Sequence, residues 1–133
     1  GVKIDLRKIK VPVYILSTKE DHIAPWKSTF AATQIYSGNT KFVLASSGHI
    51  AGVVNPPVSD RYSYRTNAKK AKTPAVWLEG ATEHKGSWWP DWDKWVKKFA
   101  GTQVAAREPG KGKFKAIEDA PGSYVKVRSS QES

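Results

Sequence analysis

The sequence predicts an α/β domain with parallel strands, flanking helices and an incomplete sheet. Two short apolar runs, residues 11–17 and 41–45, enclose a segment with helical spacing. Short and nearly continuous apolar runs are typical of strands that are buried on both faces of a parallel sheet. A strand, a helix and a second strand in this order form a βαβ unit, and we expect its crossover to be right-handed.

A single helix is predicted between these two strands. Pro25 suits the first turn of a helix, because the N–H that proline lacks would have no helical partner there. Trp26, Phe30 and Thr33 then recur at helical spacing, and Gly38 is a typical C-terminal stop.

The chain beyond the second strand is predicted to contain two further helices. Residues 51–57 are small and apolar, and the two prolines that end them block a regular helix or central strand. The polar, basic residues 58–73 are predicted to form a loop. Residues 74–80 suit a short helix with Thr73 as its N-cap, or alternatively a brief strand. A longer helix is predicted from Pro90 to a stop at Gly101, with four apolar residues at helical spacing: Trp92, Trp95, Val96 and Phe99.

The chain is expected to be the C-terminal part of a larger domain. Residues 1–101 are assigned to its main segment and residues 102–133 to a weakly structured tail with one candidate strand at residues 123–127. Residues 1–10 suit an edge strand or an amphipathic lead-in. Two parallel strands and a few helices do not cover both faces of a sheet, and six tryptophans bring a large apolar area that needs burial.

The composition limits the function classes. The chain has no cysteine, which excludes disulfides, cysteine-ligated metal and a thiol nucleophile within it. No apolar run approaches the length of a membrane span. The formal net charge of +10 favours anionic partners: nucleic acid, an anionic surface or a phosphorylated small molecule. A local cluster of basic residues suits either a binding site or a solvent-exposed face. The sequence contains no signature of a known nucleic-acid-binding module. The members of the cluster are Arg61, Arg65, Lys69, Lys70 and Lys72.

Polar groups follow both predicted strands at the point where each strand ends. Asp21 lies just past the first strand and His49 just past the second. Functional groups of open α/β sheets collect at the carboxyl ends of the strands. An acid that orients a histidine base is the back half of a nucleophilic triad, and in α/β-hydrolases the nucleophile precedes both in the chain. The alternative is a capping aspartate and a hydrogen-bonded loop histidine.

Three longer motifs carry a family resemblance. Residues 20–26 (EDHIAPW), 48–57 (GHIAGVVNPP) and 84–92 (HKGSWWPDW) resemble the C-terminal third of polyhydroxyalkanoate synthases. Residues 120–126 (APGSYVK) resemble the closing segment of the class I enzymes. The resemblance covers nearly the whole chain and implies the C-terminal portion of an α/β-hydrolase-like acyltransferase.

The resemblance also implies a reaction. The family polymerises (R)-3-hydroxyacyl-CoA, commonly 3-hydroxybutyryl-CoA, into polyester and releases CoA. Its nucleophile is a cysteine in a lipase-box-like motif that this chain lacks, and Asp21 and His49 match its triad acid and histidine. We expect no metal or redox cofactor, because an exchange of a thioester for an ester needs neither. The expected setting is a cytoplasmic, granule-associated homodimer of the full-length enzyme, with no membrane span and no nucleic-acid partner.

Other motif residues are candidates for substrate contact. His22 is expected to line the entrance, Trp26 to pack the following helix or touch substrate, and Asn55 to shape the loop that carries His49. His84 and the tryptophans from Trp88 onward suit a structural aromatic cluster or an apolar cleft. Two other readings remain open: an esterase, lipase or polyester depolymerase with a serine nucleophile, and a non-catalytic basic module that binds nucleic acid or a polyester granule.

Overall fold

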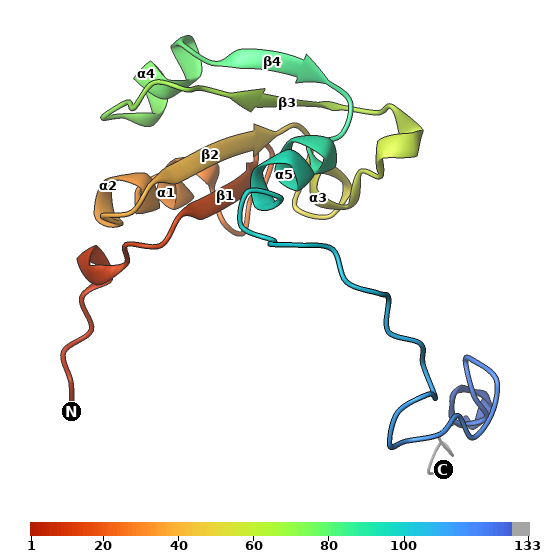
Figure 1. The fold of residues 1–133 in the computed structure, drawn as a ribbon. Coiled ribbons are helices and arrows are strands. Elements are labelled where there is room, and N and C mark those ends of the chain that lie inside the picture. The colour runs from red at the N-terminus through yellow and green to blue at the C-terminus, as the bar shows by residue number, and fades with distance from the viewer. Residues whose placement is uncertain (129–133) are drawn as a thin grey trace, which may run out of the picture. The chain divides into compact units, whose positions relative to one another are not determined.

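A four-stranded sheet organises the N-terminal unit of the chain (Figure 1). The computed structural model describes residues 1–128, and its contacts divide the chain into residues 1–99 and a second unit that begins at Ala100. The strands lie in the order in which they occur in the chain. They are β1 (Val13–Thr18), β2 (Thr40–Ala45), β3 (Ser63–Thr66) and β4 (Thr82–Lys85). β1 and β2 are parallel, whereas β3 and β4 add antiparallel pairs, so the predicted α/β class holds with a mixed sheet.

The strand pair predicted from the two apolar runs is confirmed. β1 and β2 pair in parallel over six residues each, from Val13 opposite Thr40 to Thr18 opposite Ala45. Their burial increases towards their carboxyl ends, which places the polar residues that follow them at one edge of the sheet.

The helix predicted between these strands is split in two, α1 (Trp26–Thr29) and α2 (Ala32–Ile35). Two threonine hydroxyls bond back to the helix: Thr29 Oγ1 donates to the Trp26 carbonyl at 3.0 Å, and Thr33 Oγ1 donates to the Phe30 carbonyl at 2.7 Å. The backbone between the two pieces tightens to i→i+3 bonds, such as Thr33 N to Phe30 O. Such side-chain bonds compete with the regular helical ladder and interrupt it.

The prediction of a loop over residues 58–73 is wrong, because β3 lies within that segment. The sequence did not predict β4 either. Both strands have four residues and hold few apolar side chains. Their pairing depends on backbone hydrogen bonds and on polar cross-strand contacts, such as Arg65 Nη2 to Glu83 Oε2 at 2.6 Å. A polar ladder of this kind leaves no hydrophobic period in the sequence.

The two later helices are confirmed. α4 (Pro74–Glu79) begins at the predicted N-cap, because Thr73 Oγ1 accepts from the Val76 N–H at 3.3 Å. α5 (Trp89–Val96) has Pro90 in its first turn, and it ends earlier than the predicted stop at Gly101. Residues 51–57 were not expected to form a helix, but the one-turn helix α3 (Ala51–Val54) precedes the two prolines, and the 3₁₀ turn η2 (Pro57–Ser59) begins at the second of them.

The two chain ends were predicted less well. Residues 1–10 contain the 3₁₀ turn η1 (Leu6–Lys8), capped by Asp5, in place of the edge strand that was one alternative. The strand predicted over residues 123–127 is wrong, because the 3₁₀ turn η3 (Tyr124–Lys126) bonds its amides within the segment. Within residues 1–128, no helix is long and apolar enough to cross a membrane.

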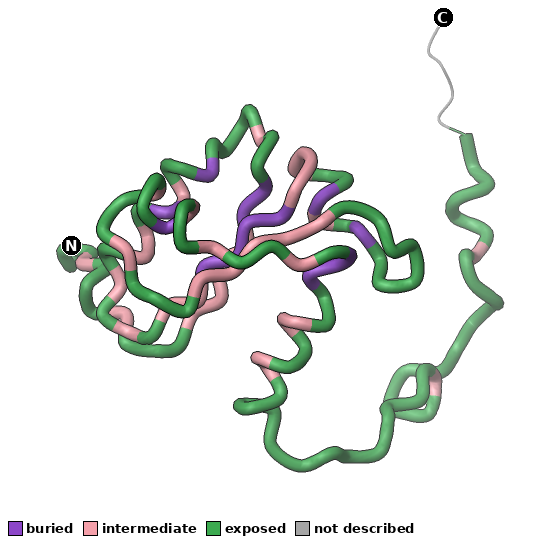
Figure 2. Tube along the Cα trace, turned by 90° about the horizontal axis from the view of Figure 1, so that it is seen from above, coloured by how far each residue is buried: buried purple, intermediate pink, exposed green. Residues whose placement is uncertain are grey.

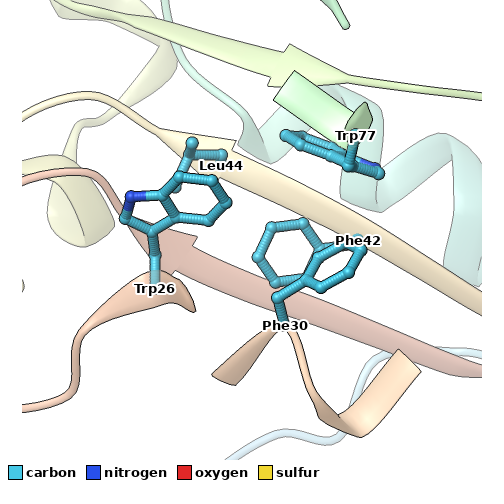
Figure 3. Close-up of a cluster of buried hydrophobic side chains, with 5 residues drawn as sticks. All are labelled: Trp26, Phe30, Phe42, Leu44 and Trp77. Atoms are coloured by element: carbon cyan, nitrogen blue, oxygen red, sulfur yellow. The ribbon is translucent and has the colours of Figure 1, made fainter. Parts of the chain in front are cut away.

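The core lies on both faces of the sheet, and β2 is its most buried strand (Figure 2). Alternate residues of a strand face opposite sides, so β2 contributes to two clusters. The first cluster joins β2 to α1 and α4 and comprises Trp26, Phe30, Phe42, Leu44 and Trp77 (Figure 3). The second is Val43, Ala45 and Trp88, packed against α3 and α5.

Replacing Trp77 with alanine is expected to lower the free energy of unfolding by about 3–5 kcal/mol, the usual cost of removing a buried aromatic side chain. Trp77 is 3% exposed and meets Phe42 edge-on at a ring separation of 5.0 Å. Denaturant unfolding followed by circular dichroism measures the effect. Val76→Ala is the matched control on the same helix, since Val76 is 55% exposed. Equal losses for the two variants would contradict this description of the core.

Candidate active site

Two loops at the carboxyl ends of β1 and β2 carry the candidate acid and base. The parallel pairing continues past the strands, because Lys19 N donates to Ala45 O at 2.8 Å and Glu20 N donates to Ser47 O at 3.0 Å. Ser47 has a φ of 67°, a left-handed conformation that is uncommon outside glycine. These bonds hold the loop of Asp21 beside the loop of His49.

Asp21 and His49 meet at this edge of the sheet. His49 Nδ1 lies 3.6 Å from Asp21 Oδ1, and the aspartate side chain is only 13% exposed. His49 Nδ1 is buried and has no hydrogen-bond partner within residues 1–128. The separation slightly exceeds that of a hydrogen bond. The carboxylate of Asp21 thus faces the imidazole nitrogen that it can orient.

The backbone around Asp21 favours its charged form. Its Oδ1 accepts from the N–H groups of Ile23 at 2.8 Å and Ala24 at 2.9 Å. The bond from Ala24 is the largest cause that lowers the pKa of Asp21, the bond from Ile23 adds to it, and His49 and His22 contribute through charge. Asp21 is therefore ionised at neutral pH and fixed in orientation by its own loop.

The structure brings one of the three candidate substrate-contact residues to this pair. The ring of His22, an exposed residue, lies edge-on to the ring of His49 with centroids 5.5 Å apart. Trp26 instead packs in the first core cluster, 8% exposed. Asn55 is 4% exposed, and its Nδ2 donates to the Arg61 carbonyl at 2.9 Å. Asn55 thus closes the turn after α3, close to its expected role as a loop-shaping residue.

Gly52, which sequence reasoning missed, fixes the distance between α3 and the sheet. A Cβ atom at this position would lie 2.3 Å from the Ser46 carbonyl oxygen and 2.9 Å from Thr18 Cγ2. No side chain fits without a shift of the backbone, so α3 packs directly against the ends of both parallel strands. The only signal in the sequence is a glycine within a short apolar segment, and it does not reveal this contact.

The arrangement can accept and return a proton. A charged carboxylate that faces Nδ1 favours the tautomer with the proton on that nitrogen, which leaves Nε2 free to act as a base. Among residues 1–128, no group of three or more His, Cys, Asp or Glu side chains is placed to bind a metal ion. The fold and the site together define an open α/β sheet with an acid–histidine pair at its carboxyl edge.

The chain is similar in sequence to several poly(3-hydroxyalkanoate) polymerases. No family model matches the sequence. The chain is 48% identical over 97% of its length to the poly(3-hydroxyalkanoate) polymerase subunit PhaC of Cupriavidus necator, and 48% over 97% to that of Rhizobium etli. It is 37% identical over 96% of its length to poly(3-hydroxyalkanoate) polymerase 1 of Ectopseudomonas oleovorans. It covers 22%, 20% and 23% of these proteins, about a fifth of their length.

The predicted resemblance to the C-terminal part of polyhydroxyalkanoate synthases is confirmed by these relatives. Along nearly its whole length, this chain is a homologue of a segment of poly(3-hydroxyalkanoate) polymerases.

Proposed function

We propose that this chain is a segment of a longer polyhydroxyalkanoate synthase and supplies the acid and the histidine of a Cys-His-Asp triad. The observation that carries the proposal is the approach of His49 Nδ1 to Asp21 Oδ1, 3.6 Å apart at the ends of two parallel strands. The similarity to polymerases over 97% of the chain supports it. The nucleophilic cysteine lies elsewhere in that longer protein, since this chain has none.

In this proposal His49 works as a general base and acid in turn. Its neutral imidazole takes the proton of the external thiol, and the thiolate attacks the thioester carbonyl of (R)-3-hydroxyacyl-CoA. The sulfur–carbon bond to CoA breaks, the imidazolium returns its proton to the CoA thiolate, and an acyl-enzyme thioester remains. His49 then deprotonates the 3-hydroxyl of another unit, which attacks that thioester and forms the ester bond of the polymer. The proton taken from the hydroxyl passes to the enzyme thiolate that leaves.

Asp21 acts through His49. Its charge stabilises the imidazolium that forms in both half-reactions, and its position selects the tautomer of the neutral ring. Two backbone N–H groups hold the carboxylate, so it need not reorganise during the cycle. His22 borders the same space and is the candidate for contact with substrate at the entrance.

The remaining assignments follow from this proposal. Residues 1–101 form the C-terminal segment of an α/β-hydrolase-like catalytic domain, and residues 102–133 form its tail, of which residues 129–133 lie outside the described part of the chain. The partners are (R)-3-hydroxyacyl-CoA and the polyester product, in a cytoplasmic, granule-associated homodimer of the full-length enzyme. The excess of lysine and arginine suits the phosphates of CoA.

A hydrolase is the second candidate, because a serine esterase, lipase or depolymerase uses the same acid–histidine geometry. The two differ in what attacks the acyl-enzyme: a 3-hydroxyl group yields polymer, whereas water yields a free hydroxy acid.

The chain alone is expected to release no CoA from (R)-3-hydroxybutyryl-CoA, because it has no thiol to acylate. The full-length protein that carries this sequence should release CoA and form polymer. Both are measured with a thiol reagent and by gas chromatography of the methanolysed product. Circular dichroism of the isolated chain verifies that it is folded. Turnover by the isolated chain would contradict the claim that the nucleophile lies outside it. Release of free 3-hydroxybutyrate without polymer by the full-length protein would favour the hydrolase.

A further inference from the structure

Two adjacent tryptophans close the C-terminal end of α3. Trp88 Nε1 donates to the Val53 carbonyl at 3.1 Å, and Trp89 Nε1 donates to the same oxygen at 3.1 Å and to the Val54 carbonyl at 3.3 Å. The two indole rings stack with centroids 4.5 Å apart. The last carbonyls of a helix have no partner within it, so these N–H groups satisfy acceptors that would otherwise need water.

α3 depends on such external contacts. It has four residues, and a single helical turn is unstable by itself. The free-energy cost of nucleating a helix exceeds the stabilisation that the hydrogen bonds of one turn provide. Gly52 places it against the sheet on one side. The two indoles, which lie 35 and 36 positions further along the chain than Val53, bind its carbonyl end.

The residues on both sides of His49 are hydrogen-bonded to α3. Gly52 N donates to the Gly48 carbonyl at 2.9 Å, and Val54 N donates to the Ile50 carbonyl at 2.9 Å. These bonds span the residues on both sides of His49 and make them part of the same turn as α3. A shift of α3 therefore changes the position of the imidazole relative to Asp21, which is held by a separate loop.

The tryptophans are in turn fixed to the sheet. Trp88 is 6% exposed and packs on Val43 and Ala45 of β2. In the first turn of α5, Asp91 accepts from the Tyr14 hydroxyl at 2.9 Å and from Lys41 Nζ at 2.7 Å. α5 is thereby tied to β1 and β2, and Figure 1 shows it beside α3. The indoles connect the buried strand pair β1 and β2 to the turn that carries His49.

We propose that Trp88 and Trp89 are positioning residues for His49, which they hold through their hydrogen bonds to the carbonyl end of α3. This rests on the proposed function, in which His49 is the base. Neither indole needs to touch substrate for this role.

The test is Trp89→Phe in the full-length synthase that carries this sequence. Phenylalanine keeps an aromatic ring and removes the N–H donor at a position that is 37% exposed. We expect kcat for CoA release to fall about 3- to 10-fold, the equivalent of one lost hydrogen bond, with KM unchanged. Trp88→Phe is the second variant, and the double variant should lose more than either.

Trp92→Phe and Trp95→Phe are the matched controls on the same helix. Their indole N–H groups donate to no acceptor within residues 1–128, yet both rings pack in the same aromatic group. They should leave kcat within about 2-fold of the wild-type value, less than the loss of one hydrogen bond. If either control lowered kcat as much as Trp89→Phe does, the effect of Trp89→Phe would reflect lost packing and not a lost hydrogen bond. That result would overturn the proposal.

A second arm separates this proposal from the proposed function. In a His49→Ala background, adding Trp89→Phe should not change the residual rate further, because the group to be positioned is gone. A further drop of the same size would show that Trp89 acts independently of His49. If His49→Ala itself kept near-normal activity, the proposed function would fail and this inference with it. An inactive His49→Ala with a normal Trp89→Phe would remove the inference alone.

Discussion

Polymer formation by the full-length synthase is expected to disappear in a His49→Ala variant, with a fall of at least ~10³-fold in rate. The imidazole has two tasks in the proposed cycle, activation of the thiol and deprotonation of the attacking 3-hydroxyl. In the structure, His49 Nδ1 lies 3.6 Å from the oriented carboxylate of Asp21, whereas the ring of His22 lies edge-on to the ring of His49. Alanine removes the base from both half-reactions and leaves no substitute held by an acid.

The loss is measured as polymer formed from (R)-3-hydroxybutyryl-CoA per enzyme. His84→Gln is the control, because His84 lies on β4, where its Nε2 is 2.8 Å from Thr66 Oγ1. Glutamine keeps a polar group at that position, so polymer formation should continue. A His49→Ala variant that forms polymer within about 10-fold of wild type would exclude His49 as the base, given the usual cost of losing a triad member.

An Asp21→Asn variant should lower polymer formation by ~10²- to 10⁴-fold. The asparagine side-chain oxygen can still accept the N–H groups of Ile23 and Ala24, so the loop keeps its shape. The same oxygen also faces His49 Nδ1, so the orientation of the ring is kept, but the neutral amide no longer stabilises the imidazolium by its charge. The fall should therefore appear in kcat rather than in stability.

The neighbouring Glu20→Gln variant is the matched control for this charge change. Glu20 is exposed and precedes Asp21 in the same loop, so a general effect of lost negative charge would appear in both variants. Steady-state kinetics with 3-hydroxybutyryl-CoA gives kcat and KM for each. A loss confined to KM, or an equal loss in the two variants, would argue against an orienting acid at position 21.

The parts of the fold that the sequence predicted are those with a local cause. β1 and β2 are continuous apolar runs, and α4 begins at a threonine that does cap it. β3 and β4 were missed because their strands are short and polar, and only pairing with β2 defines them. The prediction of a single helix after Pro25 was wrong, because two threonine hydroxyls donate to backbone carbonyls of the helix and interrupt it. The spacing of apolar residues does not reveal these bonds.

The site divides in the same way. Asp21 and His49 were predicted because polar groups at the ends of parallel strands must lie together. Some contacts around them join segments that are distant in the chain: Gly52 lies against Thr18 at the end of β1, and Trp89 reaches α3 across 36 positions of chain. Such contacts depend on tertiary packing and leave no period or motif that indicates them.

The central claim is that Asp21 and His49 activate a nucleophile that lies outside this chain. The most direct measurement is the first turnover: the rapid release of CoA when full-length enzyme and (R)-3-hydroxybutyryl-CoA are mixed in equal amounts. The wild-type enzyme should show a burst of CoA as the thiol is acylated, and His49→Ala should slow that burst by at least ~10³-fold. A burst of near-wild-type rate in the folded His49→Ala variant would contradict the claim.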